Sequence, residues 1–451
     1  MNDILSIDVG TTTFKIGVYS FDLKLIYETT RDYDVNLYDQ GKADIEPEKW
    51  WRALKSCCEE LKPHLTRIGV ISLSVTTPGL VPMAKDGAAL GPAILFFDRR
   101  SQKQAETIQK LVGKDFFIQE ACNLPVSGGS SLCSIMWIKE NQPDIWEKTY
   151  MFGHTNTYMV RRFTGQWVID PSTASITGLY HTRLNQLTYL EEVLEKGQIP
   201  RGKLPSLMRS HDKVGVILPQ IAEELSLPKD AVVLCGGNDA VLAGLSAGLK
   251  EPGEVVDIIG TCEIVAICID RPVGSANYNI RCHVLPERWV TFFILNTGGK
   301  ALEWFHSVFC RDMTADDFYQ KFIPETINRF LSQNEYEEDS LPHYLPYLQG
   351  SRYSLENLTA GFLNLNLETN RRMLLLGLLR GNFQYLGGHL KAVSEFIRLN
   401  RKITTTGGGA RIRGFHSLKK RWMGDYDYEY QDQSSLLGAA MLGKMYLDSA
   451  V

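Results

Sequence analysis

Apolar residues alternate with polar ones over the first twenty positions, and a short polar turn interrupts the alternation near its middle. An apolar segment, residues 4–9, carries Asp8 into the turn Gly10-Thr11-Thr12-Thr13, and a second segment, residues 14–19, leads away from it. This pattern predicts a β-hairpin. Its tip combines a carboxylate, a glycine and hydroxyl groups, and backbone N–H groups in such turns can hold phosphate oxygens. Ordinary hairpins share the pattern, so its chemical meaning depends on the rest of the chain.

Apolar segments that end at a glycine recur along the chain, and segments with helical spacing follow them. The clearest predicted strands span residues 67–75, 231–235, 254–259, 290–295 and 402–406, and the clearest predicted helices span residues 48–62, 240–249 and 434–447. In the second helix, Val241, Leu245 and Leu249 recur at the helical period. This alternation of strands and helices predicts an α/β fold.

The length and the apolar content predict two cores. The chain has 451 residues, of which 44% are hydrophobic, and single cores stop growing at about 250–300 residues. The second half opens as the first does, with a strand that ends in Gly260-Thr261. We therefore predict an N-terminal domain of residues 1–245 and a C-terminal domain of residues 246–451.

The charge and the cysteines exclude several classes of protein. A net charge of −4 gives no reason to expect nucleic acid or an anionic membrane as a partner. The nine cysteines have no Cys-x-x-Cys spacing, which indicates reduced thiols rather than disulfides or a zinc site. No apolar run approaches the ~20 residues that span a bilayer, and the first strand leaves no room for a signal peptide. We expect a cytoplasmic protein.

Glycine-rich turns follow four of the predicted strands. They are Asp8-Val-Gly10-Thr11-Thr12, Gly236-Gly237-Asn238-Asp239, Gly260-Thr261 and Gly407-Gly408-Gly409-Ala410. Open α/β sheets bind ligands at the carboxyl ends of their strands, although glycine also serves tight turns alone. Together, the two Gly-Thr turns suit a polyphosphate held between two halves, and the triple glycine suits a planar base.

Asp239 is the most suggestive single residue. It follows an apolar strand and a Gly-Gly turn, and it opens the predicted helix of residues 240–249. A carboxylate in this position can cap the helix. It can also act as a general base that takes a proton from a hydroxyl during phosphoryl transfer.

The ordered set of segments resembles the FGGY carbohydrate kinases, which belong to the actin–Hsp70–sugar kinase superfamily. Besides the four turns, the resemblance rests on residues 45–51 (Ile-Glu-Pro-Glu-Lys-Trp-Trp), 91–100 (Gly-Pro-Ala-Ile-Leu-Phe-Phe-Asp-Arg-Arg), 136–141, 170–175, 296–299, 345–352 and 434–440. The resemblance implies two ribonuclease-H-like, or actin-like ATPase, domains that flank a deep cleft. ATP would lie mainly on the second domain and a small-molecule sugar mainly on the first, and a homodimer would be consistent with the family.

The resemblance also implies roles for individual residues. Asp8 would hold Mg²⁺, and Asp239 would be the catalytic base. The residues that would contact ATP are Gly10, Thr11, Thr12, Lys15, Gly260, Thr261, Gly298, Gly299, Gly408, Gly409 and Ala410. The residues on the substrate side would be Thr77, Phe96, Asp98, Arg100, Asn238 and Asp239.

Several positions depart from the family pattern. Thr76-Thr77-Pro78-Gly79 stands where many xylulokinase-like members have Gln-Met-His-Gly, and Phe96 replaces a common tryptophan. Ser134 stands in place of a lysine, and Ile412-Arg413-Gly414 follows the glycine-rich turn in place of the usual serine. We favour a ketose such as xylulose or ribulose as the substrate, while a hexulose, sedoheptulose or a polyol stays open.

Three functions are consistent with these residues. The first is an ATP-dependent sugar kinase, the second an ATPase that couples nucleotide state to domain motion, and the third a catalytically silent regulator. The setting of Asp239 and the segment of residues 91–100 favour the kinase.

Overall fold

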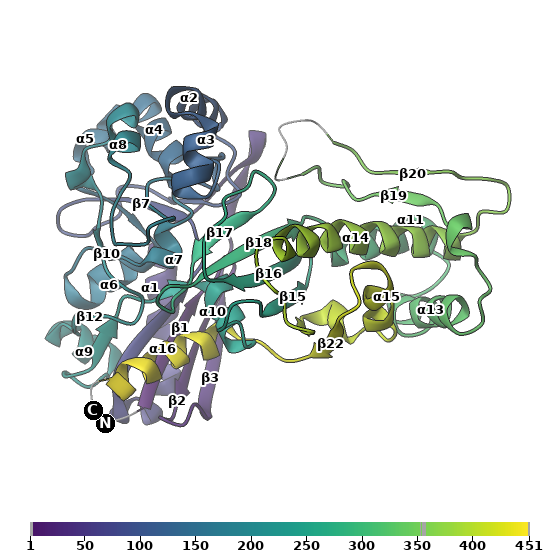
Figure 1. Ribbon diagram of the computed structural model, residues 1–451. Coiled ribbons are helices and arrows are strands. Elements are labelled where there is room, and N and C mark those ends of the chain that lie inside the picture. The colour runs from purple at the N-terminus through teal and green to yellow at the C-terminus, as the bar shows by residue number, and fades with distance from the viewer. Residues whose placement is uncertain (1–2, 352, 354–357, 450–451) are drawn as a thin grey trace.

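The computed structural model describes residues 3–351, 353 and 358–449 and has two lobes (Figure 1). Arg352, which closes one segment of the family resemblance, lies outside the described residues. The first lobe is built on a seven-stranded sheet. Its strands are β1 (Asp3–Val9), β2 (Thr13–Tyr19), β3 (Leu25–Asp32), β6 (Ile68–Val75), β12 (Lys213–Val216), β13 (Val232–Leu234) and β14 (Gly237–Asn238).

The second lobe repeats the strand pairing of the first. Its six-stranded sheet contains β15 (Val255–Ile259), β16 (Glu263–Ile269), β17 (Asn279–Cys282), β18 (Trp289–Leu295), β21 (Lys402–Thr406) and β22 (Asp427–Tyr430). In the first lobe β1, β2 and β3 are antiparallel neighbours, and β6 and β13 extend the sheet in parallel. In the second lobe β15, β16 and β18 are antiparallel neighbours, and β21 and β22 extend the sheet in parallel. The repeat matches the two ribonuclease-H-like units expected from the sequence.

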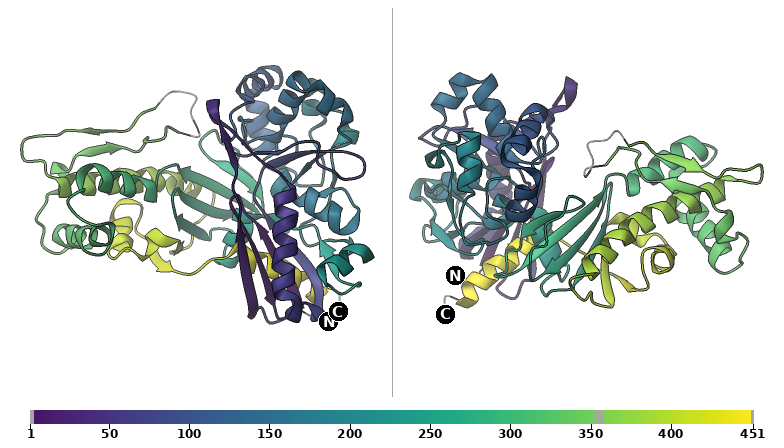
Figure 2. Two further views of the ribbon diagram at one scale, coloured as in Figure 1. Left: turned by 180° about the vertical axis from the view of Figure 1, so that it is seen from behind. Right: turned by 45° about the horizontal axis from the view of Figure 1, so that its top comes forward.

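The first lobe also carries an inserted sheet and a group of helices. Strands β4 (Asn36–Tyr38), β5 (Lys42–Ile45), β7 (Gly79–Met83), β8 (Ala93–Leu95) and β9 (Met151–His154) pair antiparallel in the order β4-β5-β8-β7-β9. Helices gather above this sheet in Figure 1, and Figure 2 shows the same group from two further directions. They are α2 (Gln102–Val112), α3 (Lys114–Phe116), α4 (Ser131–Asn141), α5 (Pro143–Lys148) and α8 (Glu191–Gly197).

The remaining helices and strand pairs are divided between the two lobes. In the first lobe they are α1 (Glu48–Leu61), α6 (Thr155–Thr164), α7 (Pro171–Ala174), α9 (Pro219–Leu225), α10 (Asp239–Ser246) and the strand pair β10 (Val168–Ile169) and β11 (Ser206–Leu207). In the second lobe they are α11 (Gly299–Phe309), α12 (Ala315–Asp317), α13 (Ile323–Leu331), α14 (Arg371–Ser394), α15 (Phe415–Trp422) and the pair β19 (His343–Leu345) and β20 (Gly361–Leu363). In the part of the chain that the structure describes, no helix combines the length and the hydropathy that a membrane span requires.

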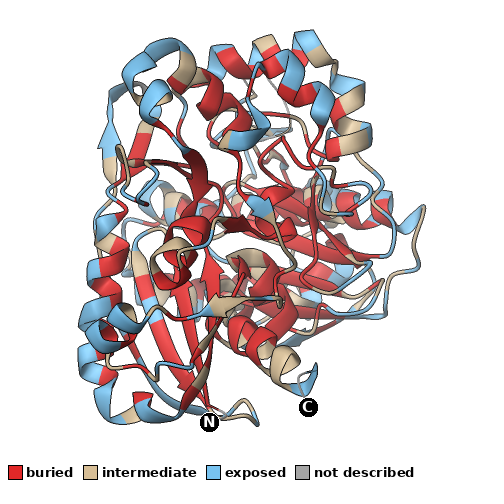
Figure 3. Ribbon diagram, turned by 90° about the vertical axis from the view of Figure 1, so that its left-hand side faces the viewer, coloured by how far each residue is buried: buried red, intermediate tan, exposed pale blue. Residues whose placement is uncertain are grey.

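The central strands hold the core. Figure 3, which faces the first lobe, shows buried residues along these strands and exposed residues on the outer turns of the helices. Trp50 and Trp51 are fully buried on α1, and all nine cysteines are free thiols, as predicted. The predicted hairpin is confirmed, and it places Asp8 opposite Lys15. The predicted helix of residues 240–249 ends earlier, at Ser246, because Gly248 adopts a left-handed conformation (φ +98°) that stops a helix.

The last helix of the chain, α16 (Ser435–Ser449), returns to the first lobe. It packs on β1 and on α10, where Leu436 and Ala440 lie against Ile4. A Cβ atom at Gly438 would overlap the carbonyl oxygen of Leu242 on α10, so only glycine allows this approach. The predicted domain boundary, near residue 245, falls at the end of α10. Because α16 packs on the first lobe, the last helix of the C-terminal half lies on the N-terminal side of that boundary.

Gly438→Ala is expected to lower the thermal denaturation temperature, because the added methyl group forces α16 and α10 apart. Overpacking of this kind costs about 1–3 kcal/mol. Gly388→Ala is the control, because Gly388 lies within α14 and a Cβ atom there meets nothing within 4 Å. That control is expected to raise the stability by up to ~1 kcal/mol through helix propensity. Equal stability of the two variants would contradict the role given to Gly438.

Candidate active site

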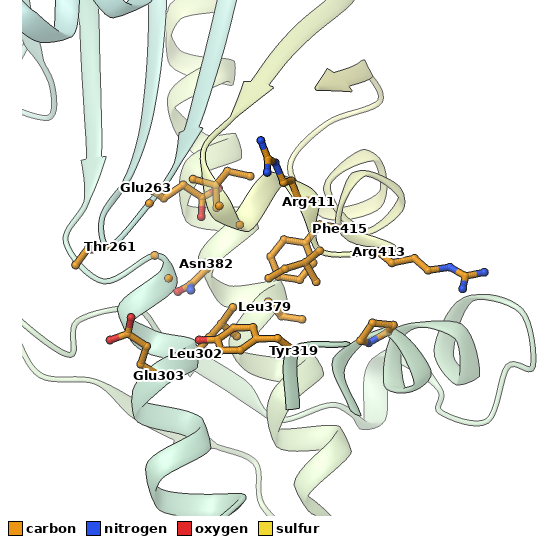
Figure 4. Close-up of a pocket in the computed structure, with 18 of the residues that line it drawn as sticks. Thr261, Glu263, Leu302, Glu303, Tyr319, Leu379, Asn382, Arg411, Arg413 and Phe415 are labelled. Carbon is orange, nitrogen blue, oxygen red and sulfur yellow. The ribbon is translucent and has the colours of Figure 1, made fainter. Parts of the chain in front are cut away.

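A cavity of about 830 Å³ opens in the second lobe beside α11 and α14. Figure 4 shows the side chains around it, which come from the β15–β16 hairpin, from both helices, from residues 315–324 and from the segment before α15. Its lining includes Gly260, Thr261, Gly298, Gly299, Gly408 and Gly409. Ala410 lies in the 3-10 helix Gly408–Arg411 with its side chain buried. The residues predicted to contact the nucleotide in this half of the chain therefore lie together.

Glycine is required where these segments meet. The Gly299 N–H donates a hydrogen bond to the Gly260 carbonyl oxygen at 2.8 Å. A Cβ atom at Gly299 would lie 2.6 Å from that same oxygen, and one at Gly407 would lie 2.6 Å from the carbonyl oxygen of Ile259. The turn after β15 is thus in direct contact with the segments after β18 and β21, and their backbone groups are left accessible to a ligand.

The cavity offers both polar and apolar contacts. Asn382 on α14 lines it and is 3% exposed, and its side-chain Oδ1 has no hydrogen-bond partner among the described residues. A buried acceptor without a partner costs about 1–3 kcal/mol, a cost that a ligand with a donor group removes. Apolar walls are formed by Leu302, Tyr319, Leu379, Phe383 and Phe415. Glycine-rich turns, an orphaned polar group and apolar walls fit a nucleotide.

The hairpin of the first lobe fixes the Asp8 carboxylate. The Ser74 hydroxyl donates to Asp8 Oδ1 at 2.6 Å, and the Ser435 hydroxyl, at the start of α16, donates to Oδ2 at 2.7 Å. Burial raises the pKa of Asp8 above its ordinary value, while both hydroxyl groups and Lys15 oppose the increase. The hydroxyl groups of Thr11 and Thr76 form a hydrogen bond, with 3.2 Å between their oxygen atoms. The neighbouring Thr12 and Lys15 are exposed, at the same tip of the sheet.

The second carboxylate, Asp239, is the first residue of α10. Asn238, rather than Asp239, is the N-cap, since the Asn238 side chain accepts from the Val241 N–H at 3.1 Å. Asp239 Oδ1 accepts from the Ala240 N–H at 2.7 Å and from Asn238 Nδ2 at 2.9 Å. Burial, together with the nearby charge of Asp8, raises the pKa of Asp239 to about 7. A carboxylate that titrates near neutrality is suited to accept a proton.

Asn238 connects this carboxylate to both lobes. Its Nδ2 donates to the Thr77 hydroxyl at 2.5 Å, and its backbone N–H donates to the Ser172 hydroxyl at 2.9 Å. Arg281, on β17 of the second lobe, donates to Asn238 Oδ1 at 2.5 Å. The positive charge of Arg281 also lowers the pKa of Asp239, against the effect of burial.

Arg281 is the site residue that the sequence analysis missed. It is 8% exposed, and its guanidinium group stacks 4.8 Å from the Phe292 ring centroid. The available signal was an arginine in a short strand beside Ile280 and Cys282. Its hydrogen-bond acceptor, Asn238, and the carboxylate whose pKa its charge lowers, Asp239, lie in the other half of the chain, so the local sequence could not identify them.

Three of the predicted substrate residues, Phe96, Asp98 and Arg100, follow β8, where Leu95 pairs with Gly79 just beyond Thr77 and Pro78. Asp98 is fully buried, and its oxygens accept from the Ala43 N–H (2.6 Å) and from the backbone and side chain of Arg100 (both 2.8 Å). Arg100 also bonds Asp44 at 2.8 Å and lines a second, shallower cavity of about 660 Å³. Phe96 packs edge-on against Phe97. The contacts of Asp98 are those of a group that supports the inserted sheet, so its substrate role stays a prediction.

The residues present fit a Mg²⁺ ion only if phosphate oxygens supply part of its coordination shell. Across the described residues, no group of three or more His, Cys, Asp or Glu side chains is arranged to hold a metal ion. Mg²⁺ in phosphoryl-transfer sites usually needs only one or two carboxylates, because substrate phosphates and water complete its shell. Asp8 meets that requirement.

The N-terminal domain pattern of the FGGY family of carbohydrate kinases matches residues 4–246, more than half of the chain. The chain belongs to this family. It is an ATP-dependent sugar kinase, as predicted from the sequence.

Relatives of the whole chain agree with the assignment. The chain is 24% identical to the xylulose kinase of Staphylococcus xylosus over 451 residues, covering 98% of this chain and 90% of that protein. It is 25% identical to the gluconokinase of Bacillus subtilis (strain 168) over 448 residues, covering 98% and 86%. The crystal structure of the xylulose kinase from Rhodospirillum rubrum superposes with a TM-score of 0.91 at 19% identity, covering 98% and 90%. This likeness confirms the actin-like ATPase fold.

Arg281→Met is expected to lower kcat by about 10- to 100-fold, because a hydrogen bond to a charged group contributes about 1.5–3 kcal/mol. Arg288→Met is the matched control, since Arg288 lies in the turn between β17 and β18 and pairs with Glu251 at the surface. Steady-state kinetics at saturating ATP and sugar measure the effect. An unchanged kcat in Arg281→Met would show that the contact with Asn238 does not serve the reaction.

Proposed function

We propose that this kinase transfers the γ-phosphate of Mg-ATP to a hydroxyl group of a small ketose, and that Asp239 is the general base. The observation that carries the proposal is the Asp239 carboxylate at the start of α10, with a pKa raised to about 7 and with Asp8 close enough to contribute to that shift. The nucleotide would occupy the cavity of the second lobe.

Each group has a defined part in the reaction. The Asp239 carboxylate takes the proton of the attacking hydroxyl, whose oxygen forms a bond to the γ-phosphorus while the bond to the bridging oxygen of ADP breaks. Asn238 and Arg281 hold the carboxylate in position. Asp8 would hold Mg²⁺, which neutralises charge on the phosphate oxygens when it is bound. The turns at Gly10–Thr12 and Gly260–Thr261 would bind the phosphates through backbone N–H groups and hydroxyls.

The substrate class rests on the first lobe. Thr77 is 5% exposed and bonds to Asn238, so its hydroxyl stands next to the proposed base. Xylulose or ribulose is the favoured substrate, since the relatives named xylulose kinase span almost the whole chain. An aldonic acid is the second candidate, because the similarity to a gluconokinase is equally extensive.

The experiment is ADP release from Mg-ATP in the presence of ketoses, polyols and aldonic acids. Activity that depends on one of these classes would establish the substrate. Asp239→Asn is expected to lower kcat by about 10²–10⁴-fold, the contribution typical of a positioned base, with ADP binding retained. Asp230→Asn, an exposed carboxylate of the same lobe, serves as the control. Wild-type turnover without any sugar would favour the ATPase, and activity of Asp239→Asn near that of wild type would remove Asp239 from the role of base.

The pH profile tests the same assignment. Because Asp239 must be ionised to accept a proton and burial raises its pKa to about 7, kcat/KM is expected to fall as the pH drops through neutrality. The decrease approaches about tenfold per pH unit on the acid side, and the rate levels off above the pKa. The residual kcat/KM of Asp239→Asn is expected not to show this decrease on the acid side. A profile that stays flat down to about pH 5 would show that no group with this pKa is the base.

A further inference from the structure

Three ionisable side chains meet behind the nucleotide cavity, where solvent does not reach. Lys419 on α15 lies 2.5 Å from Asp257 Oδ2 on β15, and it forms a second ion pair with Glu263 on β16. The side chains of all three are at most 3% exposed. We refer to Asp257, Glu263 and Lys419 as the Lys419 cluster. The mechanism proposed above uses none of the three.

The Lys419 cluster joins the elements that form the cavity. Glu263 follows directly on the turn that contains Gly260 and Thr261, and it lines the cavity. A Cβ atom at Gly298 would lie 2.6 Å from the Glu263 Cβ atom, so the segment before α11 rests on this residue. Lys419 belongs to the helix that follows the 3-10 helix Gly408–Arg411. One ammonium group thus joins the β15–β16 hairpin to the helix that follows the glycine-rich segment after β21, and the segment after β18 packs on Glu263.

Packing alone does not account for charges in this place. Burying an ion pair costs desolvation that the attraction often fails to repay, and apolar residues of similar volume are frequently as stable or more so. The Lys419 ammonium group contacts Met423 and the Phe383 ring, at 3.8 Å and 4.6 Å, in otherwise apolar surroundings. The ion pairs instead fix the relative positions of the three side chains, because each carboxylate must stay within hydrogen-bond distance of Lys419 Nζ.

We propose that Lys419 is a positioning residue for ATP, which holds the β15–β16 turn and the glycine-rich segment before α15 at the spacing that the nucleotide requires. The inference rests on the proposed place of ATP in the second lobe. It assigns Lys419 to nucleotide affinity and not to sugar binding, because every contact described for it lies within the second lobe.

The charge of the Lys419 cluster adds a second consequence. Burial raises the pKa of Glu263 above its ordinary value, and Asp257 adds to the increase while Lys419 opposes it. The other titratable groups that bear on the cluster are Tyr428 on β22 and His416 on α15. When Glu263 ionises, the cluster gains a negative charge beside a cavity that receives an anionic ligand. Nucleotide affinity is therefore expected to be lower when Glu263 is ionised than when it is protonated.

The test measures ADP binding by calorimetry, together with KM for ATP and for the sugar. Lys419→Met is expected to weaken ADP binding and to raise KM for ATP by about tenfold or more, while KM for the sugar stays within about twofold. Lys420→Met is the matched control, because this adjacent lysine is exposed and pairs with Asp425 and Asp427 at the surface. An affinity for ADP within about twofold of wild type in folded Lys419→Met would overturn the proposal.

A second variant keeps the test decisive if Lys419→Met does not fold. Asp257→Asn retains the shape of the side chain and removes one of the two ion pairs of Lys419. ADP binding is expected to weaken by about tenfold, while KM for the sugar stays within about twofold. An affinity for ADP within about twofold of wild type in folded Asp257→Asn would overturn the proposal. Failure of the wild-type protein to bind ADP would instead contradict the proposed function itself.

Discussion

The close approach of α16 to α10 is the constraint on which the first lobe depends. Both proposed catalytic carboxylates lie at the start of this helix pair. Asp239 opens α10, and Ser435, the first residue of α16, holds Asp8. The separation of the helices is set at Gly438, where no side chain fits against Leu242. A displacement of one helix would therefore move one carboxylate relative to the other, and their mutual repulsion contributes to the raised pKa of Asp239.

The repeated β-hairpin serves two purposes in the two lobes. In the first lobe the hairpin of β1 and β2 presents Asp8 beside the turn at Gly10–Thr12, where the proposed mechanism places its charge next to the phosphates. In the second lobe the hairpin of β15 and β16 carries its acidic residues, Asp257 and Glu263, behind the turn, where Lys419 balances them. Under the two proposals, the same backbone would present a charge to the ligand in one lobe and fix the position of a turn in the other.

The elements that could be predicted from the sequence are those whose signal is local. A window of about ten residues is enough to recognise the hairpin at Asp8, the strand of residues 402–406 and the glycine-rich ends of strands. The structure contains all of these elements. The residues that surround the carboxylates could not be found in this way. Ser435 is 427 positions from Asp8, and Arg281 reaches Asn238 from the other lobe. The sequence analysis considered only Asp239 as the cap of α10, whereas Asn238 is the N-cap; asparagine and aspartate are about equally common there, so the residue types did not decide between them.

The return of α16 to the first lobe has a consequence for biosynthesis. The chain leaves the ribosome from its N-terminus, so strands β1 and β6 emerge long before residues 435–449. Until those residues arrive, the apolar side chains of Ile4 and Tyr19 lack the partners that Leu436 and Ala440 provide. The first lobe can therefore complete its core only after the second lobe has been synthesised, and an exposed sheet face of this kind is a natural substrate for chaperones. Nascent chains that stop short of α16 would also lack the Ser435 hydroxyl group that donates to Asp8.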